Sequence, residues 1–463
     1  MARFDVRDER GLVKGMLGLA LPVLVEESLM LAVGYTDWWL AGHFVPGPAA
    51  LAAMGLMAYL LWLLPSLFAA LAIGATAIIS RRIGEGRLDE ANRTAHQAFL
   101  AGALLSLVAT GLALAWSDAI PRWMQLSGEA ADYATRYFRT VAAVLPLIMI
   151  EQVVIASLRG AGDTLTGLGI KGLVVVVNLI VSTGLVSGWG PFPQLGWDGL
   201  AIGTATAHGL GGLLAAAVVL RGRSGLVFRA PLLRPDAGIL RLLMRIGLPG
   251  GIDIGAIILF QFLFVAIVNR LGDASAAAHG LAVQIEALAY MPGSAFQVAA
   301  ATMAGQYLGA GNPRAARRAT VACLLAGGAV MGSAALVFAF GGPWLTSLFV
   351  GAEGAATAEQ AARLLRIVAL GIPPLTVCMI GSGTLRGSGD TVWPLTITLL
   401  GFAAIRLPLA LLWTDATGAA GVWGWNGGVE GAWWAMLADL LIRSLLIGGR
   451  LTHGGWSRVR LDR

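Results

Sequence analysis

The segment LRGAGDT at Leu158–Thr164 recurs 227 residues later as LRGSGDT at Leu385–Thr391. The same offset relates Glu26 to Asp253, and each of these acidic residues follows a proline by four positions. A chance match would not keep one offset across separated pairs of residues. We therefore expect two copies of one folding unit.

The composition excludes a water-soluble protein. Hydrophobic residues make up 57% of the 463 residues and charged residues only 13%, whereas an ordinary soluble protein carries about 25% charged residues. So few charges cannot cover the apolar surface of a chain of this length in water. Disordered chains are rich in charge and poor in apolar residues, so disorder is excluded as well. We therefore expect a multi-pass membrane protein.

Apolar runs account for most of the chain. A helix needs about 20 mostly apolar residues to cross a bilayer, and these runs are much longer than the segments of about 10 alternating residues that build a membrane β-barrel. We predict an all-α integral membrane protein with 12 transmembrane helices. The predicted spans are 14–40, 51–79, 92–116, 132–157, 165–188, 198–221, 243–269, 275–305, 314–340, 360–384, 392–413 and 430–450.

The basic residues predict the orientation. Most of the 32 Lys and Arg residues lie near the two termini or in alternate loops, for example Arg81 and Arg82 after the second span. Loops rich in Lys and Arg stay on the cytoplasmic side, so we expect both termini in the cytoplasm and an even number of spans. Tryptophans such as Trp38 and Trp39 fall at the opposite face, as in an aromatic belt. The net charge of +6 thus reports orientation, and we expect no nucleic-acid partner.

The repeat and the spans together predict two lobes. Each copy contains six spans, an even number, so both copies enter the membrane in the same direction. Such copies are related by a pseudo-twofold axis along the membrane normal. We predict an N-terminal six-helix lobe at 1–221, a cytoplasmic interlobe linker at 222–237 and a C-terminal six-helix lobe at 238–463.

Five segments, in order along the chain, resemble the signatures of one family. They are DWWLAGHFVPGPAALAAMGL (Asp37–Leu56), SRRIGEGRLDEA (Ser80–Ala91), the two LRGxGDT segments, and AAAHGLAVQIEALAYMPGSAFQVAAATMAGQYLGAG (Ala276–Gly311). Together with the duplication, they resemble multidrug and toxin extrusion (MATE) transporters, closer to the prokaryotic DinF-like and NorM-like branches.

The resemblance implies a secondary active antiporter. Such a protein exports small organic compounds, cationic or amphiphilic, in exchange for H⁺ or Na⁺ by alternating access. We expect a monomer in the plasma (inner) membrane of a prokaryote, with a small organic substrate and membrane lipid as partners. No cofactor is expected besides the coupling ion. The identity of the substrate and the choice between H⁺ and Na⁺ stay open.

Other classes of membrane protein fit the sequence less well. A lipid-linked oligosaccharide flippase of a related superfamily would need a cavity rich in arginine, and the spans contain few deep arginines. A membrane-embedded enzyme would need a convergent nucleophile, metal or acid–base set, but the five histidines and two cysteines form no such motif. A channel has no need of a duplicated lobe with acidic residues at equivalent positions.

Three acidic residues are the main candidates for cation coupling, because ionisable residues inside a span are costly and usually functional. Asp37 matches the acidic residue of the family's first span, so the resemblance implies that it binds H⁺ or Na⁺. Glu26 lies eleven residues earlier on the same helix face. Glu26 and Asp253 each follow a proline by one turn, where the helix can bend. Alternatively, Asp37 lies in the outer interface, and the other two neutralise arginines or close a cytoplasmic gate.

The fifth span adds two neutral candidates for cation coupling. Asn178 resembles an asparagine of the family's fifth span, and Ser182 stands where DinF-like members carry an aspartate. Residues four apart share a helix face. The missing carboxylate leaves less negative charge for Na⁺ and so favours H⁺. Alternatively, the hydroxyl of Ser182 bonds to its own backbone.

Other polar residues are candidates for lining the substrate cavity: Glu27, Glu151, Gln261, Gln284, Glu286 and Tyr290. Glu286 and Tyr290 lie one turn apart in the eighth span, where a carboxylate would attract a cationic substrate. A hydrogen-bonded helix contact is the alternative. Glu151 in the fourth span is expected to act similarly, and Gln261 is expected to accompany Asp253.

Two arginines in the last two spans predict a structural contact. Arg406 lies in the eleventh span, and Asp439 and Arg443 lie in the twelfth. Because an arginine inside a membrane needs a partner, we expect Arg406 to pair with the twelfth span rather than to act in transport.

Overall fold

The computed structural model describes residues 11–461 except 48, 52, 58–65, 67, 125, 349–354 and 415–426. Throughout these residues the regular structure is helical, apart from one isolated bridge between Arg223 and Leu226. Nine of the described helices are long and apolar enough to cross a membrane, or ten if one bent pair counts as a span. The predicted all-α membrane fold is therefore confirmed, and the count of 12 spans stays a prediction.

The chain packs as two compact units. Unit 1 comprises Leu21–Gly251, and unit 2 comprises residues 11–20 together with Ile252–Arg463. The first turns of the first helix therefore belong to the core of unit 2, where Met16 and Leu19 are buried. The predicted lobes at 1–221 and 238–463 and their twofold relation stay predictions.

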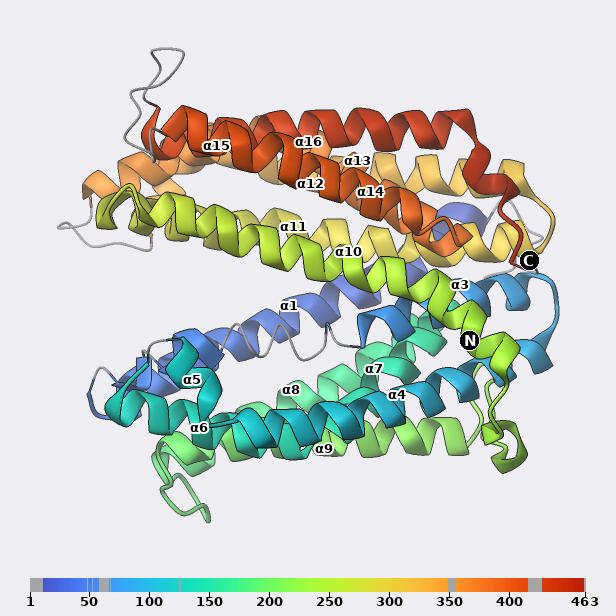
Figure 1. Cartoon of the computed structure of the whole chain (residues 1–463), viewed down its shortest axis with the longest axis horizontal. Coiled ribbons are helices and arrows are strands. Elements are labelled where there is room, and N and C mark those ends of the chain that lie inside the picture. The colour runs from blue at the N-terminus through green and yellow to red at the C-terminus, as the bar shows by residue number, and fades with distance from the viewer. Residues whose placement is uncertain are drawn as a thin grey trace. The chain divides into compact units, whose positions relative to one another are not determined.

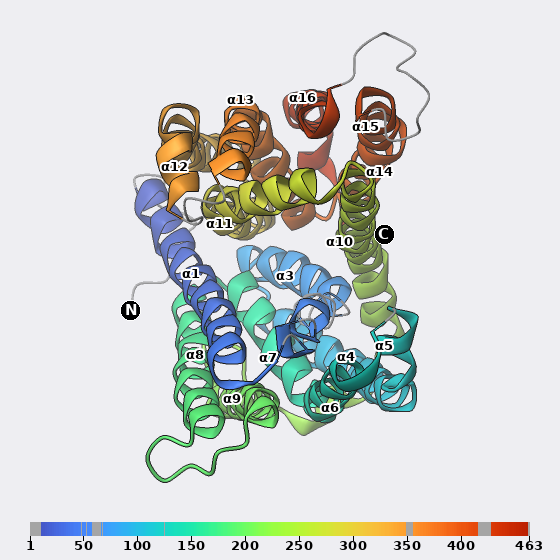
Figure 2. The same cartoon turned by 90° about the vertical axis from the view of Figure 1, so that its left-hand side faces the viewer.

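Unit 1 is built from helices that run side by side, coloured blue to green in Figure 1. They are most of α1 (Leu12–Phe44), α3 (Ala69–Gly84), α4 (Leu88–Trp116), α5 (Ala119–Trp123), α6 (Gly128–Ala143), α7 (Leu145–Gly160), α8 (Thr164–Ser187), α9 (Trp197–Leu220), the 3₁₀ turn η2 (Ala230–Leu233) and the start of α10 (Ala237–Asn269). Seen end-on in Figure 2, α8 and α9 lie next to each other, and α7 packs against both.

Unit 2 contains the remaining helices, coloured yellow to red in Figure 1. They are the rest of α10, α11 (Asp273–Gly309), α12 (Pro313–Ser347), α13 (Ala355–Ser388), α14 (Val392–Leu400), the π-helical turn η4 (Gly401–Arg406), α15 (Leu407–Thr414), α16 (Gly428–His453) and the 3₁₀ turn η5 (Gly455–Arg458). The predicted span 392–413 is thus three consecutive helical segments with a π-turn in the middle. Such turns are rare and occur frequently at functional sites.

Equivalent prolines in the two units have different effects. Helices α6 and α7 meet at Val144 with a bend of 56°, and Pro146 stands at the start of α7. Its equivalent Pro373 lies inside the uninterrupted helix α13, followed by Pro374. Proline removes one backbone hydrogen bond, but whether the helix breaks there depends on the surrounding packing.

The repeated segment LRGxGDT has the same local structure in both units. Its first glycine allows close helix contact: a Cβ on Gly160 would lie 2.9 Å from the carbonyl oxygen of Thr76, and one on Gly387 would overlap the backbone of Ala301. Its second glycine, Gly162 or Gly389, has a φ of 86° or 89°, a left-handed conformation that favours glycine. The motif is therefore a tight helix end packed against a neighbouring helix.

The segment after α9 is docked on α4 rather than hanging free. Asn92 makes two hydrogen bonds with the backbone of Val227, of 2.9 and 3.1 Å. The imidazole Nε2 of His96 accepts the backbone N–H of Arg229 at 2.9 Å. Gln97 donates to two carbonyls of this segment and accepts the N–H of Asp236. The predicted interlobe linker at 222–237 is thus held by three side chains of one helix.

Replacing Asn92 by Ala removes both bonds to Val227, each of which stabilises by about 1 kcal/mol. A loss of about 2 kcal/mol raises the population of the undocked segment roughly 30-fold. Trypsin cleavage after Arg229 in the solubilised protein should accelerate accordingly. Thr94→Ala is the matched control, because the Thr94 hydroxyl bonds to the Glu90 carbonyl of its own helix. Equal cleavage rates in the two variants would contradict the docking.

Candidate functional site

Asp37 lies buried in α1, with only 3% of its surface exposed. Its Oδ1 atom is buried and has no hydrogen-bond partner among the residues that the structure describes. The field of its carboxylate reaches the hydroxyl of Tyr137 on α6. A buried carboxylate without a partner is costly in an apolar medium, so this position favours the binding of a cation.

Three polar side chains from three helices, Tyr137, Thr204 and Asn178, form a hydrogen-bonded group, and Ser182 lies next to it. The Tyr137 hydroxyl lies 3.1 Å from Thr204 Oγ1 on α9, and Asn178 Nδ2 on α8 donates to the same oxygen at 3.2 Å. Ser182, one turn further along α8, packs against the backbone of α9 at Gly203, where an added Cβ would overlap its hydroxyl. The packing of α6, α8 and α9 therefore brings these groups together.

Two further oxygens in this region are buried without a described hydrogen-bond partner, as Asp37 Oδ1 is. Asn178 Oδ1 and Ser182 Oγ are buried and lack a hydrogen-bond partner within the described part of the chain. The structure thus brings Asn178 and Ser182 into one polar group, and Asp37 acts on it through Tyr137. Tyr137 and Thr204 were missed by the sequence analysis. The only signal for Thr204 was its place as a polar residue on the apolar helix α9, whereas Tyr137 lies on α6, which is rich in polar residues, and had no such signal.

Glu26 and Asp253 occupy equivalent ion pairs. Glu26 Oε1 accepts from Arg159 Nη2 at 2.8 Å, and Asp253 Oδ2 accepts from Arg386 Nη2 at 2.6 Å. Both acids are nearly fully buried, and both arginines belong to the repeated LRGxGDT segment. The repeat therefore conserves one buried salt bridge in each unit. The second oxygen of each carboxylate has no hydrogen-bond partner among the described residues.

The aspartate of the repeated segment forms a second equivalent ion pair. Asp163 Oδ2 accepts from Arg223 Nε at 3.1 Å, and Asp390 Oδ2 accepts from Arg450 Nε at 2.9 Å. Asp163 also caps α8 by accepting the backbone N–H of Thr166. Burial acts to raise the pKa of Asp163, but hydrogen bonds from Thr166 and Ser224 outweigh it and hold the pKa below its ordinary value.

Glu151 lies in a buried ion cluster. Its Oε1 is 2.5 Å from Lys171 Nζ on α8, and its Oε2 is 2.9 Å from His208 Nδ1 on α9. Glu151 itself is fully buried. Its carboxylate is therefore neutralised inside unit 1, which differs from the predicted role of attracting a substrate from an open cavity. Neither Lys171 nor His208 is among the site residues that the sequence predicts.

Unit 2 contains a different charge cluster. Asp439 accepts from Arg406 Nε and from Arg443 Nε, both at 2.8 Å, so the predicted pairing of Arg406 with the last span is confirmed. Phe402 lies between the two guanidinium groups, 4.3 and 4.8 Å from its ring centre. Two cations share one aspartate, and Glu286 on α11 acts electrostatically on Arg406. Asp439 is therefore the acid that pairs directly with both arginines.

The other predicted cavity residues are divided between the units. Gln261 joins the cluster of unit 2, because its Oε1 lies 3.4 Å from Arg406 Nη1. Gln284 and Tyr290 lie on α11 on either side of Glu286, and Tyr290 is exposed. Glu27 is half-buried in unit 1 and interacts electrostatically with Arg159, Glu26 and Lys171.

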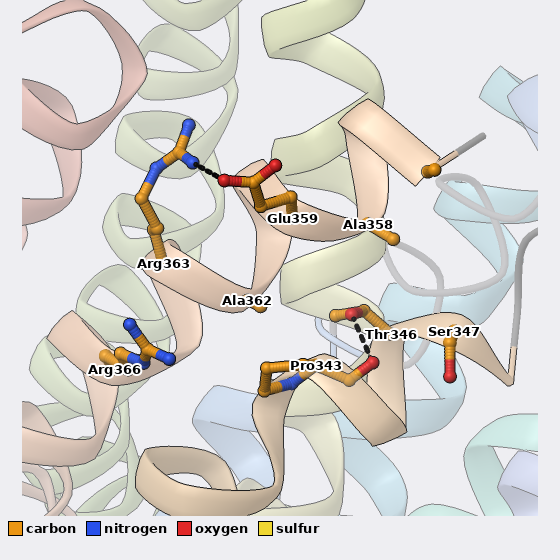
Figure 3. A pocket seen from close by; sticks show the side chains of 9 residues that line it. Pro343, Thr346, Ser347, Ala358, Glu359, Ala362, Arg363 and Arg366 are labelled. Carbon is orange, nitrogen blue, oxygen red and sulfur yellow. Dashed lines mark hydrogen bonds and ion pairs between the residues drawn. The ribbon is translucent and has the colours of Figure 1, made fainter.

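A separate hollow of about 370 Å³ lies between the end of α12 and the start of α13. Figure 3 shows Arg363 paired with Glu359 at one edge of this hollow and Thr346 bonded to the backbone of Pro343. The described residues that line it are Pro343, Thr346, Ser347, Ala355, Ala358, Glu359, Ala362, Arg363 and Arg366, and they include none of the predicted site residues.

The acid and the arginine within each of the two equivalent ion pairs should contribute non-additively to stability. Glu26→Gln removes the carboxylate that is hydrogen-bonded to Arg159, and breaking a buried pair in this way costs about 3–5 kcal/mol. The double variant Glu26→Gln/Arg159→Met removes both charges and should be more stable than the single variant. A double-mutant cycle on the apparent Tm in detergent tests this, with the Asp253–Arg386 pair as its matched repeat. Additive losses would show that the contact contributes nothing.

The lowered pKa of Asp163 predicts an acid-dependent loss of stability. Since the folded pKa lies below the unfolded value of about 3.9, the contribution is complete above that pH and disappears as the pH falls through the folded pKa. Asp163→Asn should therefore lower the apparent Tm at pH 7 and bring it closer to the parent value at the lowest usable pH. Asp118→Asn, which removes an exposed pair with Arg139, should change little. An equal Tm for Asp163→Asn and the parent at pH 7 would contradict a stabilising role for the charge of this carboxylate.

Known proteins similar to this chain extend over almost its whole length. A family model described as MatE matches residues 22–183 and 254–412. A probable multidrug resistance protein NorM from Thermotoga maritima is 26% identical over 449 residues, covering 96% of this chain and 93% of that protein. Another from Burkholderia pseudomallei is 29% identical over 445 residues, covering 93% of this chain and 91% of that protein.

A solved structure gives the same result for the fold. The crystal structure of a MATE protein in complex with MaL6 superposes with a TM-score of 0.89 at 20% identity, covering 99% of this chain and 100% of that chain. The family model spans both units, and the predicted resemblance is confirmed. The protein is thus a multi-pass membrane protein that belongs to the MATE family of multidrug efflux transporters, whose members are transporters rather than enzymes.

Proposed function

We propose that this protein is a secondary antiporter that exports small organic compounds, cationic or amphiphilic, in exchange for H⁺ or Na⁺. The coupling ion binds at Asp37. The observation that carries this proposal is the buried Oδ1 of Asp37, which has no hydrogen-bond partner among the described residues. A bound proton or Na⁺ removes the cost of that isolated carboxylate.

The groups around Asp37 suit either ion. Asn178 Oδ1 and Ser182 Oγ are buried neutral oxygens without a described partner, and Thr204 connects Asn178 to Tyr137. One carboxylate with neutral oxygens can bind Na⁺, whereas a proton needs only the carboxylate. Because Ser182 adds no second negative charge, the site favours H⁺ over Na⁺.

Competition between the ion and the substrate is sufficient for antiport. An ion that enters from outside occupies Asp37 and weakens the binding of a cationic substrate, which then leaves. Substrate binding from the cytoplasm or the inner leaflet favours the return of the carrier. A ligand shifts a conformational equilibrium only by its differential affinity for the two states, so this competition needs no direct contact between ion and substrate.

Glu26 and Asp253 act in this proposal as parts of gates rather than as ion sites. Each already holds an arginine of the LRGxGDT segment. A salt bridge at equivalent positions of both units supports a role in closing the cytoplasmic ends. The protein acts as a monomer in the prokaryotic inner membrane, with both termini in the cytoplasm.

Proteoliposomes test the proposal. Efflux of ethidium, tetraphenylphosphonium and rhodamine 6G is measured under a pH gradient alone and under a Na⁺ gradient alone. The parent protein should respond to at least one gradient. Asp37→Asn removes the ionisable group, so its gradient-driven efflux should fall by about 100-fold or more.

Asp198→Asn is the control for the loss of a carboxylate. Asp198 forms a half-exposed ion pair with Arg136 at the start of α9, so this variant should keep gradient-driven efflux. If the parent protein ignores both gradients, antiport is wrong. If Asp37→Asn responds like the parent, the assignment of the coupling site is wrong.

A further inference from the structure

Glu151, Lys171 and His208 continue the polar group around Asp37 along the interior of unit 1. On α9, His208 follows Thr204 by one turn, about 6 Å along the axis. On α8, Lys171 precedes Asn178 by seven residues, so the two share a helix face about 10 Å apart. Because Asn178 and Thr204 are hydrogen-bonded to each other, the cluster forms a second level on the same pair of helices.

The hydrogen bond to Glu151 fixes the state of the His208 ring. A carboxylate can only accept, so Nδ1 carries the hydrogen and donates it to Glu151 Oε2 at 2.9 Å. In the neutral ring, Nε2 then has a free lone pair and is the atom that accepts a proton. Lys171 neutralises the other oxygen of Glu151. With a neutral imidazole the three side chains carry no net charge, and a proton on His208 adds one positive charge.

A glycine on α9 leaves space for the Glu151 carboxylate beside His208. Gly211 follows His208 by three residues on the same face of α9, and a Cβ there would lie 3.1 Å from Glu151 Oε2. The charged and titratable groups facing His208 come from three helices: Glu151 on α7, Lys171 on α8 and, one level away, Tyr137 on α6. Of these, Glu151 stabilises an imidazolium and Lys171 opposes it.

Beyond the cluster lie the acidic residues of α1. Glu27 interacts electrostatically with Lys171 and with Arg159, and Glu26 forms its salt bridge with Arg159. On α7, Arg159 follows Glu151 by eight residues, about 12 Å along the axis. The ionisable groups of unit 1 therefore follow one another from Asp37, through His208 and its partners, to the Glu26–Arg159 pair.

We propose that His208, Glu151 and Lys171 form a proton relay between the Asp37 site and the Glu26–Arg159 end of unit 1. This inference rests on the proposed function and assigns H⁺ as the coupling ion. The proton leaves the Asp37 carboxyl, passes through the Thr204 hydroxyl or water, and joins His208 Nε2. Asp37 becomes a carboxylate, and the imidazolium shares the single negative charge of Glu151 with Lys171, so the cluster carries one positive charge in this step. His208 then releases a proton towards Glu27 and water and returns to its neutral form.

Two substitutions separate a relay from a structural role. His208→Gln keeps a neutral donor for Glu151 but cannot take up a proton. His208→Lys keeps the ion pair with Glu151 but holds a fixed charge. If His208 only supports the structure, at least one of the two variants should retain proton coupling. If His208 carries the proton, neither variant should retain it. His279→Gln is the matched control, because His279 is a buried histidine in unit 2 that accepts from Trp433.

The experiment compares two modes of transport in proteoliposomes, with whichever organic cation the parent protein moves. Gradient-driven efflux requires net proton movement, whereas substrate counterflow requires only the substrate-loaded carrier. Both His208 variants should lose pH-driven efflux by about 100-fold or more and keep counterflow near the parent rate. The control variant should keep both activities.

Each other outcome overturns the relay. If either His208 variant keeps pH-driven efflux, protons do not need this residue. If both variants lose counterflow as well, His208 supports folding or substrate binding instead. A parent that responds to Na⁺ alone refutes the relay and leaves the proposed antiport intact. A parent that responds to neither gradient refutes the antiport itself.

Discussion

A charge enclosed by apolar helices must find a partner of opposite sign, because its hydration is lost. Most of the buried acids in both units are accordingly paired with a basic side chain. Glu26, Asp253 and Asp439 each hold at least one arginine, and Glu151 holds a lysine. Against this background Asp37 differs from the other buried acids, since no described basic side chain forms an ion pair with it. Among the described residues, Asp37 is thus a buried carboxylate that the fold itself does not compensate with a basic side chain.

The two units keep some of these contacts and differ in others. The LRGxGDT segment carries an arginine that pairs with an acid of the preceding first helix of its unit and an aspartate that pairs with a later arginine, and both pairs are present twice. The clusters deeper in the helices are not duplicated: Glu151 with Lys171 and His208 in one unit, Asp439 with Arg406 and Arg443 in the other. The repeated contacts shape the helix ends, and the unrepeated ones distinguish the two interiors.

The sequence predicted the membrane class and the family, because composition, apolar runs and ordered motifs can be read without knowing how the helices pack. Of the polar group near Asp37 it singled out Asn178 and Ser182 but not Tyr137 and Thr204. It also predicted that Arg406 pairs with the last span. It did not predict the partners of Glu151, since these depend on how three helices pack, although a single Lys171 in an apolar run was a visible signal. Nor could it distinguish Pro146, which follows a sharp bend, from Pro373, which lies in an unbroken helix. The number of spans and the coupling ion stay predictions.

Because residues 227–236 are docked on α4, a division of the chain near the expected linker breaks contacts of unit 1. A division of the chain at 222, where the linker was expected to begin, would separate Asn92, His96 and Gln97 from the backbone that they bind. A division after Asp236 would preserve those bonds but would still remove from unit 1 the first turns of α10, which belong to it. The segment between the two expected halves is therefore held by hydrogen bonds within unit 1, and neither of these two divisions leaves all of its contacts intact.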